Sequence, residues 1–321
     1  MRRALLDRAV RDAALTTRAT GDEKMKALIL GGSGMMGHKL WQIFDPEFET
    51  FVTLRKSLSG YSQYGLFQEA RTIAGVSAQE LDSVARALDK VRPAVVVNCL
   101  GIVKQAEEAK DPLMTIWTNA LFPHQLARLC QERDCCLIHI STDCVFSGRK
   151  GDYGENDLPD AEDLYGRTKF LGEVSYENCL TLRTSMIGRE LETSHGLIEW
   201  FLSQEGRTVD GYTRAIFSGF TTNALSEIIA KIVDEQPEMY GVWHIASYPI
   251  SKFDLLSLVK KVYGLNIGIQ RDEAVVCDRS LNADRFRQAT GFVPPTWYDM
   301  IEQMYRDPTL YSELRRPCAS R

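Results

Sequence analysis

The sequence predicts an α/β fold in which a doubly wound parallel sheet carries a smaller C-terminal lobe. Between residues 25 and 185, short apolar runs without period-two alternation are separated by stretches of helical periodicity. That pattern is typical of strands whose two faces are both covered by helices. A chain of 321 residues is long enough for one large α/β unit and an appended lobe. After residue 185 the alternation loosens, which indicates a second, less regular unit.

The strands and helices of the first unit can be assigned in order. Apolar runs predict strands at 27–30, 51–54, 94–98, 136–140 and 181–184, with the first helix at 36–44. Ser77 and Glu80 have the spacing of a capping box in front of a helix that begins at Leu81. The pair at 111–112, Asp followed by Pro, is expected to cap and open a helix that runs towards Arg133.

We divide the chain into four parts. These are an extension at 1–24, expected to be poorly ordered, a first unit at 25–185, a mainly substrate-binding lobe at 186–310 and a tail at 311–321. The lobe is predicted to contain helices at 222–234, 251–263 and 297–306. The boundary between the two units is weak, because the chain can cross between them more than once.

Composition and charge exclude several classes of protein. Hydrophobic residues make up 44% of the chain and charged residues 25%, as in ordinary globular proteins. The net charge of −5 gives no broad positive field, so nucleic-acid binding is not expected. We find no apolar run of about 18 residues and no secretory signal. The eight cysteines form no zinc-like spacing, so we expect reduced thiols, no metal site and a cytoplasmic protein.

A glycine-rich loop follows the first predicted strand and runs into the first helix. In a loop of this kind, backbone N–H groups and a helix N-terminus can meet a pyrophosphate. Gly31 would make the turn, Gly34 would admit the phosphates and Gly37 would let the helix pack closely. We therefore predict a Rossmann-type dinucleotide site, and expect His38 to lie on the helix surface. The cofactor-binding candidates in the loop are Gly31, Ser33, Gly34, Met35, Met36 and Gly37.

Two cations follow the second strand, at the place where an acidic residue would bind the ribose of NAD. Arg55 and Lys56 instead suit the 2′-phosphate of NADP. The sequence therefore favours NADP(H) over NAD(H). The loop after the fourth strand supplies one further cofactor-binding candidate, Gly101.

Tyr165 and Lys169 are four residues apart, which places them on one face of a helix. In that arrangement the lysine can lower the pKa of the phenol and reach the nicotinamide ribose, and the tyrosine can exchange a proton. The same spacing recurs at Tyr248 and Lys252, so position must decide between the two pairs. Only Tyr165 follows a strand that ends in hydroxyl side chains, with Thr142 able to bind a carbonyl oxygen.

Four motifs stand in the order of the extended short-chain dehydrogenase/reductases: the glycine loop, 141–148, 165–169 and 182–185. Within that superfamily the chain most resembles the dTDP-4-dehydrorhamnose reductases, from about residue 25 to residue 306. The similarity includes the late segments 279–282 and 290–292.

The resemblance implies NAD(P)H-dependent reduction of the 4-keto group of a nucleotide-linked 6-deoxysugar, for surface polysaccharides. It implies that Tyr165 is the general acid, Lys169 its partner and ribose ligand, and Thr142 the hydroxyl that holds the carbonyl. A diphosphate needs a fork of donors, for which Arg214 is the first candidate and Lys104 the second. The candidates for substrate binding are Asp143, Lys104, Asn119, Trp200 and Arg214.

Two positions depart from the pattern of the rhamnose reductases. Cys144 stands where tyrosine is common, and Met186 stands where a tryptophan that faces the sugar is common. An aromatic platform for a sugar is therefore missing from an expected place. Because of these departures, the sequence does not identify the sugar or the nucleotide. The choice between a monomer and a homodimer is also open.

Two other functions remain open. A nucleotide-sugar epimerase or dehydratase would use the same tyrosine and lysine with a permanently bound NAD, but Arg55 and Lys56 favour an exchangeable NADP. A non-catalytic nucleotide-binding regulatory subunit is the third hypothesis, because the regulatory subunit of methionine adenosyltransferase resembles the same reductases. Retention of Thr142, Tyr165 and Lys169 together favours an enzyme.

Overall fold

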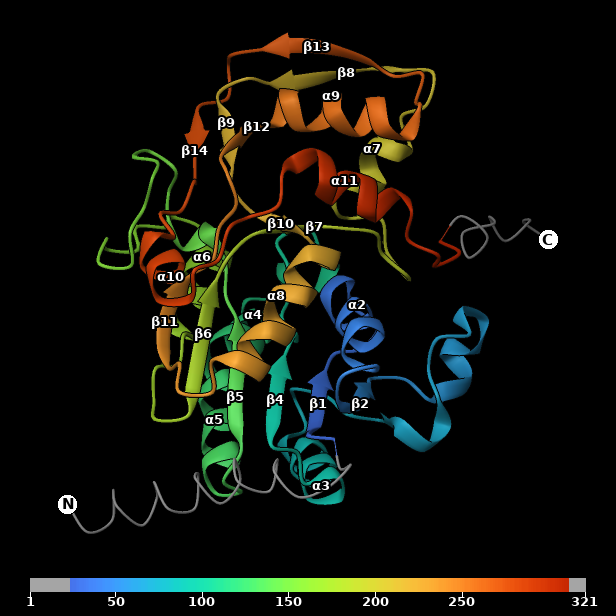
Figure 1. Cartoon of the computed structure of the whole chain (residues 1–321), viewed down its shortest axis with the longest axis vertical. Helices are drawn as coiled ribbons and strands as arrows, with labels where there is room; N and C mark the ends of the chain where they lie inside the picture. Colours follow the sequence, from blue (N-terminus) through green and yellow to red (C-terminus); the bar gives the residue numbers. More distant parts are fainter. Residues whose placement is uncertain (1–23, 312–321) are drawn as a thin grey trace.

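The computed structural model describes residues 24–311, in which a seven-stranded parallel sheet forms the centre of the molecule. The strand order is β11-β6-β5-β4-β1-β2-β3 (Figure 1). The strands are β1 (Lys26–Leu30), β2 (Glu49–Leu54), β3 (Thr72–Ala74), β4 (Val95–Asn98), β5 (Cys136–Ile140), β6 (Cys179–Arg183) and β11 (Gly241–His244). The order reverses between β1 and β4, which is the switch point of a doubly wound sheet. This confirms the predicted fold class.

Helices cover both faces of the sheet. They are α2 (Met35–Phe44), α3 (Leu81–Val91), α4 (Pro112–Ile116), α5 (Phe122–Gln131), α6 (Leu164–Leu171) and α8 (Thr222–Glu235). Because strand side chains alternate, Ile29 of β1 packs into the core that contains α2 and α8 residues. Leu28 and Leu30 pack into the core on the other face, with residues of α3 and α5. Burial on both faces explains why the strands read as continuous apolar runs.

A smaller lobe lies over the carboxyl ends of the strands, at the top of Figure 1. Its strands form small sheets that pair β10 with β7, β9 with both β12 and β14, and β13 with β8. The strands are β7 (Met186–Ile187), β8 (Thr208–Tyr212), β9 (Ala215–Phe217), β10 (Phe220–Thr221), β12 (Ile250–Ser251), β13 (Gly268–Asp272) and β14 (Cys277–Asp278). The helices of the lobe are α7 (Leu197–Leu202), α9 (Lys252–Tyr263) and α11 (Trp297–Tyr305), whereas α10 (Asp284–Thr290) packs beside β11 at the edge of the main sheet. The predicted helices at 222–234, 251–263 and 297–306 are thus confirmed as α8, α9 and α11.

The chain returns from the lobe to the main sheet. After β10, α8 packs beside α2 on one face, and β11 then pairs in parallel with β6 at the sheet edge. The segment between residues 186 and 310 therefore contributes to both units. The expected extension at 1–24 lies, except for its last residue, outside the described residues, as does the tail after residue 311.

One predicted helix start is correct and one is wrong. Asp111 caps α4, since its Oδ1 accepts hydrogen bonds from the backbone N–H groups of residues 113 and 114. The capping box before α3 does not form. Glu80 is the N-cap residue of α3, and its side chain makes no capping hydrogen bond. The Ser83 hydroxyl donates to the Glu80 carbonyl over 2.6 Å and accepts a hydrogen bond from the Ser77 N–H. A serine inside the helix thus replaces the predicted cap.

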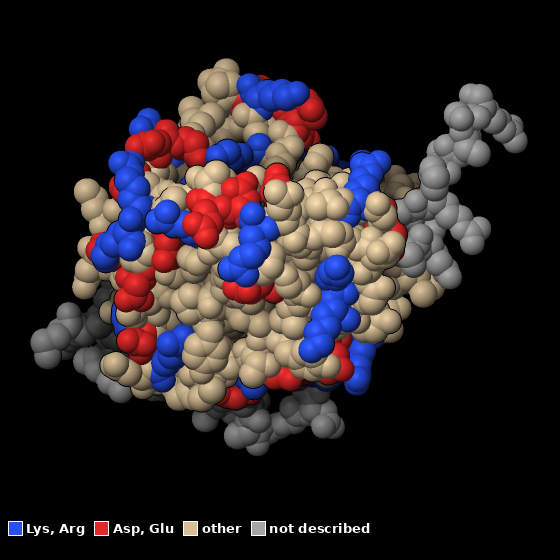
Figure 2. Space-filling model, turned by 90° about the horizontal axis from the view of Figure 1, so that it is seen from above, with Lys and Arg blue, Asp and Glu red and all other residues tan. Residues whose placement is uncertain are grey.

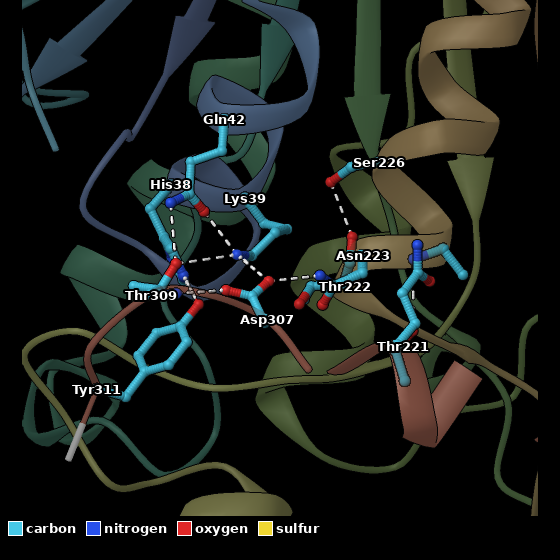
Figure 3. Close-up of polar contacts among 12 residues, drawn as sticks. His38, Lys39, Gln42, Thr221, Thr222, Asn223, Ser226, Asp307, Thr309 and Tyr311 are labelled. Atoms are coloured by element: carbon cyan, nitrogen blue, oxygen red, sulfur yellow. Dashed lines mark hydrogen bonds and ion pairs between the residues drawn. The ribbon is translucent and has the colours of Figure 1, made fainter. Parts of the chain in front are cut away.

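A buried polar cluster joins α2 to the segment that follows α11 (Figure 3). Lys39 Nζ donates to Asp307 Oδ2 over 2.6 Å, and the two side chains are only 3% and 6% exposed. Asn223 Nδ2 donates to the same oxygen over 2.6 Å, and Gln42 Nε2 donates to the Thr309 hydroxyl. Removal of either ion would leave a buried charge without its partner, so the cluster holds the last described residues against α2.

His38 belongs to the same region, and its predicted surface position is wrong. The imidazole is fully buried, with Nδ1 2.8 Å from the Gly34 carbonyl oxygen and Nε2 2.8 Å from the Tyr311 hydroxyl. A carbonyl can only accept, so Nδ1 carries the proton and Nε2 accepts from Tyr311. The helix face that carries His38 would be exposed on an isolated α2, but the C-terminal segment covers it.

Surface charges are mixed on the face seen from above the lobe. In Figure 2, Lys and Arg side chains alternate with Asp and Glu, without a broad area of one sign. Between residues 24 and 311, no helix is long and apolar enough to cross a membrane. In the same part of the chain, no group of three or more His, Cys, Asp or Glu side chains could hold a metal ion.

Candidate active site

The glycine loop lies at the carboxyl end of β1, beside the switch point of the sheet. Gly31 has φ of +86°, a conformation that side chains disfavour. A Cβ on Gly37 would lie 2.1 Å from the Gly31 carbonyl oxygen, so only glycine lets α2 approach the turn. A Cβ on Gly34 would touch only that same oxygen, at 3.4 Å, which leaves open space in front of the helix N-terminus. The loop therefore fits a pyrophosphate.

The other loop candidates differ in exposure. Ser33 and Met35 are half-buried beside the open side of the loop, whereas Met36 is 5% exposed and packs in the core. Met36 can therefore offer only its backbone to a cofactor. The hydrogen bond from His38 fixes the carbonyl of Gly34, which is the residue at the helix N-cap.

Arg55 and Lys56 follow β2 directly and are exposed. Each faces a glutamate from a distant segment: Arg55 lies 3.6 Å from Glu108, and Lys56 Nζ lies 2.5 Å from Glu192 Oε1. The Glu192 carboxylate raises the pKa of Lys56 through its hydrogen bond and its charge. Two cations that could meet a 2′-phosphate therefore stand at the edge of the predicted cofactor site, already paired.

The residues after β5 bring hydroxyl and carboxyl groups together. Thr142 is buried, and its hydroxyl accepts from the Cys144 N–H and donates to Asp143 Oδ1 over 3.2 Å. Burial raises the pKa of Asp143, while the charges of Arg279 and Lys252 act in the opposite direction. Thr142 can turn its hydroxyl from this carboxylate to a carbonyl oxygen of a substrate.

Helix α6 presents Tyr165 and Lys169 to the same place. Asp163 caps the helix by accepting from the Gly166 N–H over 2.7 Å. A Cβ on Gly166 would lie 2.2 Å from the Cys144 carbonyl oxygen, so the first turn of α6 packs directly against the segment after β5. The Tyr165 hydroxyl is thereby brought within reach of the Thr142 hydroxyl.

Burial dominates the electrostatics of this pair. Burial raises the pKa of Tyr165 above its usual value, and the Thr142 hydroxyl only partly offsets this. Burial also lowers the pKa of Lys169 to about 8, against the attraction of the Glu173 carboxylate. Lys169 Nζ donates to the Ile140 carbonyl over 2.7 Å and lies 3.5 Å from His139 Nε2. The net pKa shift of Tyr165 is therefore upward, and Lys169 is not among its principal causes.

The second tyrosine–lysine pair is not a helical pair. Tyr248 precedes β12 and is 49% exposed, and Lys252 is the first residue of α9. The two side chains therefore do not share a helix face. The structure brings together the pair that the sequence position favours, Tyr165 and Lys169.

Asn119 holds a loop instead of pointing to free space. It lies in a π-helical turn, η5 (Trp117–Leu121), between α4 and α5. Its Oδ1 accepts from the Ile102 N–H over 2.8 Å, and its Nδ2 donates to the Ile102 carbonyl over 2.9 Å. Both amide groups are thus used to position the segment that contains the exposed Gly101. A substrate contact by Asn119 would require these bonds to break.

Two cavities adjoin the candidate catalytic residue Tyr165 and its neighbour Asp163. The first, of about 180 Å³, is lined by Ile102, Lys104, Ala109, Thr115, Asp163, Leu164 and Tyr165. The second, of about 260 Å³, is lined by Ser147, Arg149, Glu162, Asp163 and Arg279. Lys104 lines the first cavity and its Nζ donates to Asp163 Oδ2 over 2.9 Å, while its predicted contact with substrate stays a prediction. Asp163 lines both cavities, with Tyr165 on the wall of the first and Arg279 on the wall of the second.

Lys252 and Arg279 are site residues that the sequence analysis missed. Both lie close enough to Asp143 for their charges to act on its pKa. Lys252 Nζ lies 4.3 Å from the centre of the Phe217 ring, and Arg279 Nε donates to the Phe146 carbonyl over 2.8 Å. In the described part of the chain, neither has a carboxylate within ion-pair distance. Arg279 could have been found from the sequence, because it belongs to the segment 279–282 that carries the family resemblance. Lys252 was not selected, because it was considered only as the partner of Tyr248.

Trp200 and Arg214 belong to the lobe, and neither lines the two cavities. Trp200 is on α7, 39% exposed, with its ring centre 6.4 Å from that of Phe201. Arg214 is exposed in the turn between β8 and β9, where its carbonyl accepts from the Cys277 N–H. Their predicted contacts with substrate stay predictions.

Comparison with known protein families gives a match over nearly the whole described chain. The model of the RmlD substrate binding domain matches residues 25–309. A relative from Haloferax volcanii, the probable low-salt glycan biosynthesis reductase Agl14, is 25% identical over 83% of this chain and 87% of its own length. The dTDP-4-dehydrorhamnose reductase of Shigella flexneri is 25% identical over 70% of this chain and 83% of its own.

Solved structures repeat the fold. A dTDP-4-dehydrorhamnose reductase from Bacillus anthracis, crystallised in complex with NADP, superposes with a TM-score of 0.72. The superposition covers 88% of this chain and 99% of the other, at 18% sequence identity. At that identity the likeness establishes the shared fold, and the chemistry must be argued from the residues of this chain.

Proposed function

This chain belongs to the RmlD substrate binding domain family and is an NAD(P)-dependent reductase of the extended short-chain type, and on that premise we propose that it uses NADPH to reduce the 4-keto group of a nucleotide-linked 6-deoxysugar. The observation that carries the proposal is the meeting of Thr142, Tyr165 and Lys169 at the carboxyl edge of the sheet. The glycine loop opens at the same edge. The product would be an activated deoxysugar for surface polysaccharides.

The side chains divide the work of a carbonyl reduction. The bound nicotinamide cofactor supplies the hydride. Tyr165 donates its phenolic proton to the oxygen that becomes an alkoxide, and its raised pKa keeps the proton in place until then. The Thr142 hydroxyl donates a hydrogen bond to the same oxygen and stabilises its developing charge. In this proposal Lys169 binds the nicotinamide ribose and returns a proton to Tyr165.

The preference for NADPH rests on Arg55 and Lys56. They are exposed at the end of β2, where the adenosine ribose of a dinucleotide lies in this fold. Each charge-assisted contact to a 2′-phosphate contributes roughly 1.5 to 3 kcal/mol. We expect NADPH to bind at least about tenfold more tightly than NADH.

The nucleotide diphosphate needs positive groups within an acidic protein. Arg279 and Lys252 stand beside Asp143 without an ion-pair partner in the part of the chain that the structure describes, and Arg279 lines the second cavity. We add these two side chains to the predicted contacts Lys104 and Arg214. A guanidinium fork suits a diphosphate oxygen pair.

A turnover assay with defined substrates tests the proposal. Purified protein is incubated with NADPH and a panel of nucleotide-linked 4-keto-6-deoxysugars, and NADPH oxidation is followed together with the product. We expect stoichiometric NADPH consumption and a new 4-hydroxyl group for at least one substrate. The alternatives need a nucleotide-linked sugar that carries a 4-hydroxyl group: its epimer, formed without net cofactor consumption, would instead establish an epimerase, and formation of the 4-keto-6-deoxysugar from it would establish a dehydratase. Cofactor binding without any turnover would favour the regulatory-subunit hypothesis.

A further inference from the structure

Lys56 is paired with a carboxylate from a distant part of the sequence. The Glu192 carboxylate accepts a hydrogen bond from Lys56 Nζ over 2.5 Å, although the two residues are 136 positions apart. The side chain of Glu192 is 26% exposed and that of Lys56 is 53% exposed. The ring of Tyr61 lies on another side of the ammonium, with its centre 5.6 Å from Nζ. Lys56 is therefore held by two partners before any cofactor enters.

The loop that carries Glu192 is firmly built against the cofactor loop. Glu190, two residues earlier, accepts hydrogen bonds from the Thr193 hydroxyl and from the N–H groups of residues 195 and 196. A Cβ on Gly196 would lie 2.7 Å from the terminal methyl of Met35, which begins α2. The loop therefore packs on the residue that follows the N-cap Gly34. Glu192 is presented to Lys56 from a fixed position over the predicted dinucleotide site.

We propose that Glu192 determines cofactor selectivity in this enzyme by competing with the 2′-phosphate of NADP for Lys56. This rests on the proposed function, because it takes Arg55 and Lys56 as the binding site of the 2′-phosphate. A phosphate and a carboxylate at the same ammonium repel each other, so NADPH must displace Glu192. NADH has only a hydroxyl at that position, and the ion pair can persist beside it. Glu192 thus lowers the affinity for NADPH relative to that for NADH, compared with a protein that lacks this carboxylate.

Arg55 has a weaker version of the same arrangement. It lies 3.6 Å from Glu108, and the two side chains are 66% and 45% exposed. An ion pair that is so exposed has little strength, because water screens it. We therefore expect Glu192 to have the larger effect on cofactor choice, and Glu108 a smaller one in the same direction.

The test compares the two reduced cofactors in one variant and one matched control. NADPH and NADH are titrated by fluorescence into the full-length protein, into Glu192→Gln and into Glu302→Gln. Glu302 is also ion-paired, with Arg306 at 2.8 Å, and is 32% exposed, but it lies on α11. Glu192→Gln should tighten NADPH about threefold to tenfold and change NADH by less than about twofold. Glu302→Gln should change neither.

A double-mutant cycle shows whether the effect passes through Lys56. In a Lys56→Met background, Glu192→Gln should no longer favour NADPH. Equal changes for both cofactors, or weaker NADPH binding in Glu192→Gln, would overturn the inference. Glu192→Ala serves as a second variant, with a melting curve for each protein to verify folding. If the unaltered protein binds NADPH but Glu192→Gln does not change the ratio of the NADPH and NADH affinities, only this inference fails. If the unaltered protein binds neither cofactor, the proposed function itself fails.

Discussion

At the scale of single residues, burial shifts the pKa values of the two proposed catalytic groups, Tyr165 and Lys169, in opposite directions. Burial keeps the phenol of Tyr165 protonated and makes the ammonium of Lys169 easier to deprotonate. Tyr165 is therefore suited to act as an acid, which a reductase needs for the developing alkoxide. Lys169 titrates much nearer to neutral pH than an exposed lysine does, so its charge becomes sensitive to the environment.

The first prediction concerns Tyr165. Tyr165→Phe removes the proton donor and keeps the ring, so NADPH affinity should stay unchanged while kcat falls by about 10² to 10⁴. Lys169→Ala should weaken both cofactor binding and turnover. Steady-state kinetics and cofactor titration measure these effects, and Tyr248→Phe is the matched control. Damage from the control variant, with an active Tyr165→Phe, would mean that the active site is assigned to the wrong tyrosine.

The second prediction concerns pH. The pKa of Lys169 is lowered to about 8, so the free enzyme loses this positive charge as the pH rises through that value. Because kcat/KM reports ionisations of the free enzyme, it should fall on the alkaline side with an apparent pKa near 8. A pH profile of kcat/KM for NADPH, taken at a saturating concentration of the nucleotide sugar, measures this. A flat profile up to pH 10 would show that the charge of Lys169 is not required.

At the scale of elements, strand ends and helix starts build the site. Thr142 follows β5, Tyr165 and Lys169 belong to α6, and Lys252 begins α9. The lobe contributes its cations through a small sheet in which β9 pairs with both β12 and β14. Lys252 follows β12, and Arg279 follows β14, so the pairing with β9 brings the two cations to one place. The two residues are 27 positions apart in the sequence, so their proximity cannot be predicted from spacing.

The third prediction compares two arginines of the lobe. Arg279 lines a cavity next to the catalytic residues, whereas Arg214 is exposed in the β8–β9 turn. If Arg279 binds the diphosphate in ground state and transition state alike, Arg279→Gln should raise the KM for the nucleotide sugar about tenfold or more with little change in kcat. Arg214→Gln, proposed from sequence for the same role, is the parallel variant.

Melting curves accompany both arginine variants, because Arg279 also donates a hydrogen bond to the Phe146 carbonyl. A lowered Tm with unchanged KM would assign Arg279 a structural role. A raised KM in Arg214→Gln alone would move the diphosphate site to the β8–β9 turn.

At the scale of the whole molecule, the C-terminal segment completes the first helix of the cofactor-binding unit. Asp307 and Tyr311 reach Lys39 and His38 of α2 across more than 260 positions. His38 in turn holds the Gly34 carbonyl at the glycine loop. The pKa of Asp307 is lowered to about 2: burial alone would raise it, but the Lys39 hydrogen bond and charge outweigh that effect. The end of the described chain thus stabilises the place where a cofactor would bind.

The fourth prediction concerns stability against acid. Burial lowers the pKa of His38 and of His244 to about 4, from the usual 6.5. Between these pH values the unfolded chain binds protons that the folded protein excludes, so the free energy of unfolding should fall as the pH drops from 6.5 to 4. Each histidine contributes roughly 3 kcal/mol over that window. Urea unfolding at a series of pH values measures the slope.

A histidine variant makes the acid prediction specific. His38→Gln should reduce the pH dependence between 6.5 and 4, because glutamine does not titrate there. Tyr311→Phe, which removes the hydroxyl that bonds Nε2, should lower stability at neutral pH and keep most of the slope. A slope that is identical in the original protein and in His38→Gln would exclude His38 as a contributor.

The parallel α/β core, most of its strands and helices, the glycine loop and the spacing of Tyr165 and Lys169 on one helix face could all be predicted from the sequence. These features rest on local signals: apolar runs, helical periodicity, glycines before a helix, and side chains four residues apart. The strand at 241–244 was missed because it is half-buried at the sheet edge and has no long apolar run. The Ser77 capping box failed because Ser83 made a better local bond.

Tertiary structure alone decided which distant side chains meet. It buried His38 and Lys39 under residues 307–311, gathered Lys252 and Arg279 beside Asp143, and set Glu192 against Lys56. None of these contacts follows from spacing, since each joins segments between about 100 and 270 positions apart. Burial and charge pairing depend on everything packed around a group, so the pKa values of Tyr165 and Lys169 could be assigned only once the fold had enclosed them.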